Sequence, residues 1–180
     1  MKVDSAGWLS GVRRVPSPNC DARPPGTDIE LLVIHNISLP PGEFGGGDII
    51  RLFTNRLDPE SHPFYTQLKD LKVSAHFLVR RDGTILQFVS CGKRAWHAGA
   101  SSWRGRERCN DFSLGVELEG SDDTPFDDRQ YAALARLTRL LRRNYPLREA
   151  VGHAAVAPGR KTDPGPFFDW PGYRSAVWQA

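Results

Sequence analysis

One short run near the carboxyl end of the chain brings together side chains that could bind a metal and act on a substrate. It extends from His153 to Asp163 and places Lys161 two residues before the aspartate. The run is rich in proline and glycine, which suits a rigid surface loop better than a buried core. Imidazole nitrogen and carboxylate oxygen are common zinc ligands, so His153 and Asp163 could share a metal if a third ligand came from elsewhere.

His35 is the best candidate for that third ligand, because it ends the apolar run 31–35 and precedes the polar Asn36. In open α/β sheets, ligands bind at the ends of strands. A lone histidine in this position is more often a hydrogen-bonded residue at a sheet edge, but the presence of His153 and Asp163 favours a ligand. Two histidines and one aspartate leave a fourth tetrahedral position for water, as in catalytic zinc sites.

Glu117 and Lys161 are the candidate catalytic residues. Glu117 lies within the apolar run 113–119, where an ionised carboxylate is costly unless it is paired or used. Beside a metal it could act as a general base toward water. A solvent-facing glutamate on a one-sided sheet is the alternative, and it fits Glu119 better. Lys161 could stabilise a developing oxyanion, or it could be an ordinary solvated loop lysine.

A loop rich in aromatic and basic residues follows at 92–111 and could contribute to a binding cleft. Trp96 could stack on a sugar face or simply pack, and the neighbouring His97 offers an imidazole. Arg104, Arg106 and Arg108 could bind carboxylates of an anionic peptide, or they could form a solvated basic loop.

Composition limits the class of protein. The 180 residues form one domain that is long enough to bury a core, and no apolar run could span a bilayer. The net charge of +3 suits small anionic substrates and does not by itself indicate nucleic acid. The three cysteines are far apart and odd in number, as expected for reduced thiols. The amino-terminal residues lack an apolar signal region, so we expect a cytoplasmic protein. We also expect a monomer without membrane or nucleic-acid partners.

Spacing and turn signals predict the elements that position these residues. Strands are expected at 31–35, 75–80, 84–89 and 113–119, with Asp82-Gly83 as a hairpin turn between the second and third. Helices are expected at 48–55, at 61–71, from Thr124 to Pro146, and from 173 to the end. Thr124 would cap the long helix, with Pro125 in its first position and Asp127 completing the capping pattern.

These elements imply an α/β fold, a single domain with a central mixed β-sheet flanked by helices. Residues 1–28 are expected to be irregular and to pack on a domain formed by residues 29–180, and residues 92–111 are expected to be mostly loop.

Seven segments spread over nearly the whole chain carry a family resemblance. The chain resembles the zinc-dependent N-acetylmuramoyl-L-alanine amidases of the type-2 family in residues 13–18, 33–42, 73–76, 94–99, 109–113, 115–120 and 160–166. Within that family it is similar to the cytoplasmic amidases that act on 1,6-anhydro-muropeptides. The resemblance implies the fold of phage lysozyme-type amidases and peptidoglycan recognition proteins.

The resemblance also implies an activity and a set of roles. The activity is hydrolysis of the amide bond between 1,6-anhydro-N-acetylmuramic acid and L-alanine during cytoplasmic peptidoglycan recycling, which indirectly limits β-lactamase induction. One zinc ion per chain would be held by His35, His153 and Asp163, with Glu117 and Lys161 in the catalytic positions. Substrate contacts would be made by Asn36, Trp96, His97, Arg108, Leu118 and Ala154.

The chain departs from the family pattern after His153. Relatives usually carry an aspartate two residues further on, whereas Ala154 and Ala155 follow here. Loss of a residue that supports a metal ligand can cost about 10- to 100-fold in metal affinity or activity. A non-catalytic muropeptide-binding module is the main alternative function, but such proteins tend to have lost a zinc ligand. A regulatory role through a protein partner has only fold analogy behind it.

Overall fold

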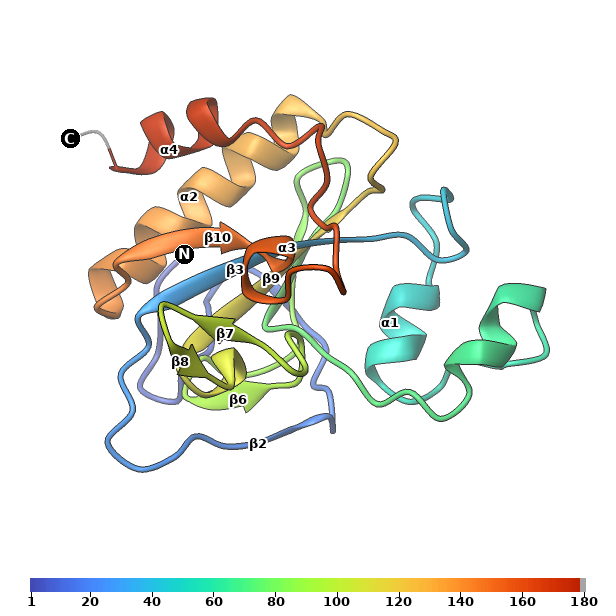
Figure 1. Cartoon of the computed structure of the whole chain (residues 1–180), viewed down its shortest axis with the longest axis horizontal. Helices are drawn as coiled ribbons and strands as arrows, with labels where there is room; N and C mark the ends of the chain where they lie inside the picture. Colours follow the sequence, from blue (N-terminus) through green and yellow to red (C-terminus); the bar gives the residue numbers. More distant parts are fainter. Residues whose placement is uncertain (179–180) are drawn as a thin grey trace.

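The computed structural model of the chain describes residues 1–178 and is centred on a six-stranded mixed sheet (Figure 1). The strands, in their order across the sheet, are β1 (Arg13–Arg14), β5 (Ile85–Gln87), β4 (Phe77–Val79), β9 (Ser113–Glu119), β3 (Leu31–Ile37) and β10 (Glu149–Gly152). Neighbours run parallel except for β4 and β5, which form the antiparallel hairpin predicted from Asp82-Gly83. The predicted fold class, an α/β domain with a central mixed sheet, is confirmed.

The two longest strands, β3 and β9, lie side by side in the middle of this sheet. Their apolar side chains alternate between the two faces, as the period of two requires. Ile34 of β3 and Val116 of β9 enter the largest core cluster. The next residues, His35 and Glu117, are register partners and therefore share the opposite face. The functional side chains are thus held by the most deeply buried part of the sheet.

Two helices cover the face that carries the large core. Helix α2 (Asp128–Asn144) and helix α4 (Trp170–Trp178) lie side by side over the sheet (Figure 1). Leu134, Leu137 and Leu141 of α2, together with Tyr173 and Val177 of α4, join the same core cluster as the sheet residues. Burial of these apolar side chains is the main force that holds the two layers together.

A smaller unit packs against the sheet through a second core cluster. It consists of helix α1 (Asp48–Phe53) and the 3-10 helix η1 (Pro63–Leu68). Leu52 and Phe53 of α1 contribute to this cluster with Leu78 of β4. The segment 61–71, predicted as a helix, is therefore a shorter 3-10 helix, because Pro63 begins it and the chain turns again at residue 69.

Helix α2 begins three residues later than predicted. Its cap is Asp127, whose backbone N–H donates to the Gln130 side chain at 3.1 Å in a reciprocal capping box. The prediction of Thr124 as cap and Pro125 as first residue is wrong, because buried Gln130 is also tied to carbonyl groups of the sheet. The helix ends at Asn144, and Pro146 follows its cap as predicted.

Short elements replace parts of the chain that were expected to be irregular. Residues 1–28 supply β1 at the sheet edge and the strand β2 (Cys20–Ala22). The segment 92–111 supplies three strands and a 3-10 helix, namely β6 (Lys93–Ala95), β7 (Ser102–Trp103), β8 (Arg106–Glu107) and η2 (Cys109–Asp111). Strands of two or three residues are too short to show an alternation of apolar and polar side chains.

The carboxyl-terminal part also differs from the prediction. Strand β10 and the one-turn helix α3 (His153–Val156) were not predicted. Helix α4 begins at Trp170, three residues earlier than expected, and the predicted last two residues of that helix lie outside the described part of the chain. Among residues 1–178, no helix is both long enough and apolar enough to cross a bilayer.

Candidate active site

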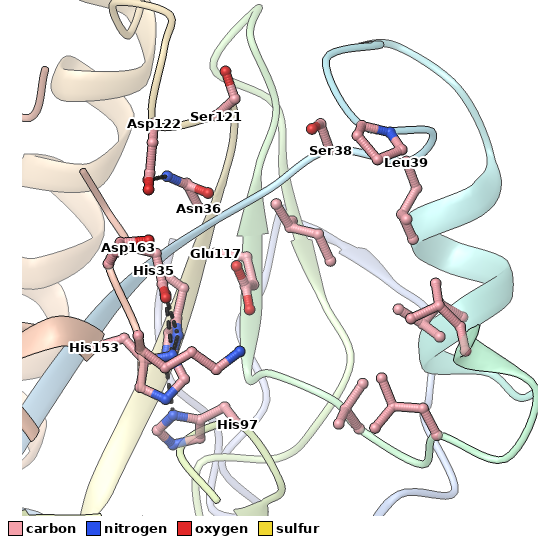
Figure 2. A pocket seen from close by; sticks show the side chains of 18 of the residues that line it. His35, Asn36, Ser38, Leu39, His97, Glu117, Ser121, Asp122, His153 and Asp163 are labelled. Atoms are coloured by element: carbon pink, nitrogen blue, oxygen red, sulfur yellow. Dashed lines mark hydrogen bonds and ion pairs between the residues drawn. The ribbon is translucent and has the colours of Figure 1, made fainter. Parts of the chain in front are cut away.

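The three predicted metal ligands meet at one end of the sheet (Figure 2). The His35 Nδ1 atom lies 3.0 Å from His153 Nδ1 and 3.0 Å from Asp163 Oδ2. His153 Nδ1 is 3.1 Å from the same carboxylate oxygen. One nitrogen from each histidine and one oxygen from the aspartate therefore face a common centre.

The register of the sheet explains why residues so distant in sequence meet. Gly152, the last residue of β10, pairs with Ile34 of β3, so the residues that follow, His153 and His35, are neighbours. Gly152 also allows the Asp163–Pro164 segment to approach. A Cβ at this position would lie 2.8 Å from Pro164 Cδ, which is closer than real contacts allow. The ligand loop therefore requires glycine at the end of β10.

The surroundings of the two histidines fit a metal site. The second ring nitrogen of His153, Nε2, lies 3.2 Å from the Ala98 carbonyl oxygen, which can only accept a hydrogen bond. His153 Nε2 must therefore carry the proton, which leaves a lone pair on Nδ1. Burial lowers the pKa of His35 to about 4, so the His35 imidazole is neutral near pH 7. Two imidazoles and a carboxylate are a typical donor set for zinc.

The aspartate is in its ionised, ligand-competent form. Burial raises the pKa of Asp163, but the neighbouring His153 and His35 side chains outweigh this effect and leave the pKa well below its ordinary value. Among the described residues, these three form a group whose ligand atoms all lie within 4.8 Å of one another. The group could hold a metal ion.

Glu117 lies on the same face of the sheet, paired with His35 in the register. Its side chain is buried, and Oε2 has no hydrogen-bond partner in residues 1–178. Burial raises the pKa of Glu117 well above its ordinary value, and the nearby Asp163 raises it further. A buried carboxyl group without a partner is costly, so its environment suits a group that exchanges protons with a ligand.

A cavity of about 610 Å³ opens in front of these groups. One wall is polar and includes the metal-binding group, Glu117 and Lys161, whose positive charge lowers the pKa of Glu117 in opposition to burial. The opposite wall is apolar and comes largely from the α1 and η1 region, with Leu52, Phe64 and Leu71. The volume of the cavity is within the usual range for small-ligand sites.

Asn36 is fixed at the edge of this cavity. Its Nδ2 donates to Asp122 Oδ1 at 2.7 Å and to the Pro164 carbonyl oxygen at 3.1 Å. Because both amide protons point away, the Asn36 side-chain oxygen remains on the side of the cavity (Figure 2). Asn36 therefore offers a ligand a hydrogen-bond acceptor in a defined orientation.

The structure does not bring all the predicted substrate contacts to this cavity. Asn36 and His97 line it, although His97 is largely buried against His35 and Ser113. The Leu118 side chain is fully buried in the core and offers no surface to a ligand.

The other three predicted contacts lie outside the cavity lining formed by residues 1–178. Trp96 is half-buried, and Ala154 uses its backbone N–H to bind the Asp163 carbonyl oxygen at 2.9 Å. Arg108 pairs with Asp111 at 3.2 Å and lines a neighbouring cavity of about 540 Å³. Arg160, which had no predicted role, lines both cavities.

Ala155, where relatives usually carry an aspartate, is exposed on α3. The imidazole of His153 is supported instead by the Ala98 carbonyl oxygen. Asp122 is a site residue that sequence reasoning missed. The available signal was its position just after the strand 113–119, at the sheet end that also carries His35.

Comparison with known proteins identifies the class. The family model described as N-acetylmuramoyl-L-alanine amidase matches residues 25–166, and the chain belongs to this family. The resemblance predicted from sequence motifs is therefore confirmed.

Individual members of the family are similar to this chain over most of its length. The Escherichia coli K12 protein named 1,6-anhydro-N-acetylmuramyl-L-alanine amidase AmpD is 57% identical over 173 residues, which are 95% of this chain and 94% of the relative. A crystal structure of a selenomethionine AmpD derivative is 55% identical, covers 98% of this chain and 99% of its own, and has a TM-score of 0.95.

A second solved structure contains a ligand. The Escherichia coli amidase AmiD was determined in complex with the substrate anhydro-N-acetylmuramic acid-L-Ala-D-γ-Glu-L-Lys. It is 31% identical, covers 82% of this chain and 57% of its own, and has a TM-score of 0.60.

Proposed function

We propose that this protein hydrolyses the amide bond between 1,6-anhydro-N-acetylmuramic acid and L-alanine in muropeptides, with zinc as its cofactor. The observation that carries the proposal is the buried, unpartnered Glu117 facing the group formed by His35, His153 and Asp163. The name of the AmpD relative and the substrate in the AmiD complex support the choice of bond.

His35, His153 and Asp163 would hold the zinc ion, because their ligand atoms converge and their protonation suits metal binding. When bound, zinc supplies Lewis-acid chemistry, which polarises a carbonyl group and lowers the pKa of water. The expected effect of Ala154 and Ala155 on metal affinity stays a prediction.

Two side chains of the protein would transfer the protons of the reaction and stabilise the negative charge that develops on the carbonyl oxygen. Glu117 accepts a proton from the attacking water as the new carbon–oxygen bond forms. The raised pKa of Glu117 lets it keep this proton and then deliver it to the nitrogen of L-alanine as the carbon–nitrogen bond breaks. Lys161 lines the same cavity, where its ammonium stabilises the negative charge on the carbonyl oxygen.

The physiological setting belongs to the same proposal. We place the protein in the cytoplasm as a monomer that acts on small soluble anhydro-muropeptides during peptidoglycan recycling and thereby indirectly limits β-lactamase induction. Support comes from the AmpD relatives and from the free cysteines, since Cys91 and Cys109 are buried thiols of the kind that persist in a reducing compartment.

The test is to incubate the purified protein with an anhydro-muropeptide, with and without a chelator, and to follow the products by chromatography and mass spectrometry. Free peptide and anhydro-N-acetylmuramic acid should appear, disappear with chelator and return when zinc is added. Tight binding without any product would instead support the non-catalytic binding module. Equal cleavage of the reducing, non-anhydro substrate would refute the anhydro preference and leave the amidase activity standing.

A further inference from the structure

His97 connects the metal-binding group to the interior of the protein. Its Nδ1 lies 3.0 Å from His35 Nε2, and its own Nε2 lies 3.2 Å from Ser113 Oγ. His35 and Ser113 are fully buried, and His97 is 9% exposed. Figure 2 shows the His97 ring directed at the histidines of the metal-binding group. Three buried side chains therefore form one hydrogen-bonded line that starts at a metal ligand.

The direction of these hydrogen bonds follows from the role of His35. For its Nδ1 to offer a lone pair to a metal, the His35 proton must sit on Nε2. That proton needs an acceptor, and the nearby acceptor is His97 Nδ1. His97 must then be in the tautomer that carries its proton on Nε2, where Ser113 Oγ can accept it.

The two metal-binding histidines are therefore oriented by different means. His153 donates to the Ala98 carbonyl oxygen, an acceptor that cannot change its role. His35 depends on an imidazole, which accepts at Nδ1 in only one of its two neutral tautomers. The orientation of the His35 ligand therefore depends on the tautomer of His97.

The backbone of β9 is shaped to hold the His97 ring in this place. A Cβ at Gly115 would lie 2.5 Å from His97 Cγ and 2.7 Å from His97 Nδ1. Gly115 does not have a positive φ, and the three atoms nearest to such a Cβ all belong to the His97 ring. A glycine in the middle of a central strand is otherwise unfavourable, so its presence indicates that the close approach of the ring is needed.

We propose that His97 is a positioning residue whose Nδ1 holds His35 in its metal-binding tautomer, with the Ser113 hydroxyl accepting the His97 Nε2 proton in that state. This inference rests on the proposed function in one respect, because it presupposes zinc binding at His35, His153 and Asp163.

The tautomers of the wild-type protein can be measured directly. In protein labelled with nitrogen-15 at histidine and loaded with zinc, NMR spectra that couple ring nitrogens to ring protons distinguish the two tautomers. We expect His97 to carry its proton on Nε2 and His35 to bind zinc through Nδ1. A His97 proton on Nδ1 would overturn the inference without any variant being made.

Variants test whether the hydrogen bond matters for metal affinity. His97→Phe keeps a ring but removes the acceptor, and we expect zinc to bind about 10- to 100-fold more weakly, measured by competition with a chromophoric chelator. His97→Asn restores an acceptor two bonds from Cβ, at the distance of the histidine Nδ1, and should bind zinc nearly as tightly as wild type. Ser113→Ala removes the acceptor of the His97 Nε2 proton and should weaken zinc binding less than His97→Phe.

The controls separate this inference from the proposed function. His62→Phe removes a histidine that caps η1, and it should leave zinc affinity unchanged. Circular dichroism and urea unfolding of the metal-free variants report whether each one folds. Wild-type affinity in folded His97→Phe would overturn the positioning role alone. A wild-type protein that binds no zinc would overturn the proposed metal site, and this inference with it.

Discussion

Glu117 carries a buried carboxylate oxygen that has no hydrogen-bond partner within residues 1–178. A buried acceptor left in this state costs about 1–3 kcal/mol of stability. A glutamate that served only the fold would be expected to have a partner, as Glu119 has in the Gly45 and Arg81 backbone N–H groups. At the residue scale, the site therefore gives up stability at the position where a proton must be moved.

Replacing Glu117 by glutamine tests this assignment, because glutamine has the same shape but cannot take up the proton. We expect Glu117→Gln to lower kcat by about 10²- to 10⁴-fold, the usual contribution of a general base. Zinc content should remain at the wild-type level, since Glu117 is not among the ligand atoms. Glu60→Gln, at an exposed position, is the matched control. Near-normal turnover of Glu117→Gln with full zinc would refute the assignment.

Asp122 acts on the same cavity through Asn36. It accepts a hydrogen bond from Asn36 Nδ2 and so keeps the Asn36 oxygen available to a ligand. We expect Asp122→Ala to raise KM about tenfold with a smaller change in kcat, as loss of one hydrogen bond to a charged group would predict. Asp122→Asn retains an acceptor and should behave nearly as wild type.

Steady-state kinetics of these two variants is the measurement, and Asp123→Ala is the control, because Asp123 is the exposed neighbour. If Asp122→Asn were as impaired as Asp122→Ala, the charge of Asp122 would matter rather than the orientation of Asn36.

At the scale of elements, the site depends on three parallel strands that end at the same edge of the sheet. Strand β9 supplies Glu117, and β3 supplies His35. The β10–α3 junction supplies His153 and packs directly on the Asp163–Pro164 segment. A displacement between these elements of a fraction of an ångström would separate the ligand atoms.

Gly152→Ala would produce such a displacement. Its Cβ would lie 2.8 Å from Pro164 Cδ, so Pro164 and the adjoining Asp163 would have to move away from His153. We expect a loss of about 1–3 kcal/mol in unfolding free energy, as for other overpacked sites, together with weaker zinc binding. Urea unfolding and chelator competition measure the two effects. Gly92→Ala is the control, since its nearest contact would be 3.6 Å from Ser90 Oγ; equal effects in both variants would contradict the packing argument.

The elements also show what could be predicted from the sequence. Strands β3 and β9 were predictable from the apolar runs 31–35 and 113–119, in which His35 and Glu117 stood out. Strand β3 continues two residues beyond the predicted end, to Ile37, so His35 lies within the strand. Strand β10 has only four residues, beginning with Glu149, and it becomes a strand because β3 pairs with it. The start of α2 depends on Gln130, whose amide binds the Val79 and Glu119 carbonyl oxygens, a tertiary contact with no local signal.

The same limit applies to the site. His35, His153 and Asp163 were predicted from residue type and position, and the structure brings them together. The pairing of Asn36 with Asp122 joins residues 86 positions apart, and the apolar wall from α1 and η1 faces the ligands only after the sheet has formed. Local sequence patterns carry no information about such contacts.

At the scale of the whole molecule, the fold encloses imidazoles in a neutral state. Burial lowers the pKa of His35 to about 4 and lowers the pKa of His76 and His97 well below 6.5. His76 is held as a neutral ring, since its Nδ1 accepts the Gly115 backbone N–H at 3.0 Å and its Nε2 donates to the Lys93 carbonyl oxygen at 3.0 Å. In the metal-free protein, the three rings therefore stay neutral in the pH range where the histidines of the unfolded chain take up protons.

The metal-free protein should therefore lose stability as the pH falls from about 6.5 to 4.5. In this window the unfolded chain takes up a proton at each of the three histidines and the folded chain does not. Each histidine therefore lowers the free energy of unfolding by up to about 1.4 kcal/mol per pH unit. Glu117 acts in the opposite direction, because its raised pKa lets the folded chain keep a proton that the unfolded chain releases. Unfolding therefore takes up about two protons net, so the free energy of unfolding should fall by up to roughly 3 kcal/mol for each pH unit.

Urea unfolding at pH 7.5, 6.5 and 5.5 in the presence of a chelator measures this dependence. His76→Asn offers a side-chain oxygen to the Gly115 N–H but cannot be protonated. It should therefore reduce the slope of the unfolding free energy against pH by the contribution of about one proton. A stability that stays constant or rises between pH 6.5 and 5.5 would show that the buried histidines do not control acid unfolding. An unchanged slope in His76→Asn would show that His76 is not one of the groups that take up protons.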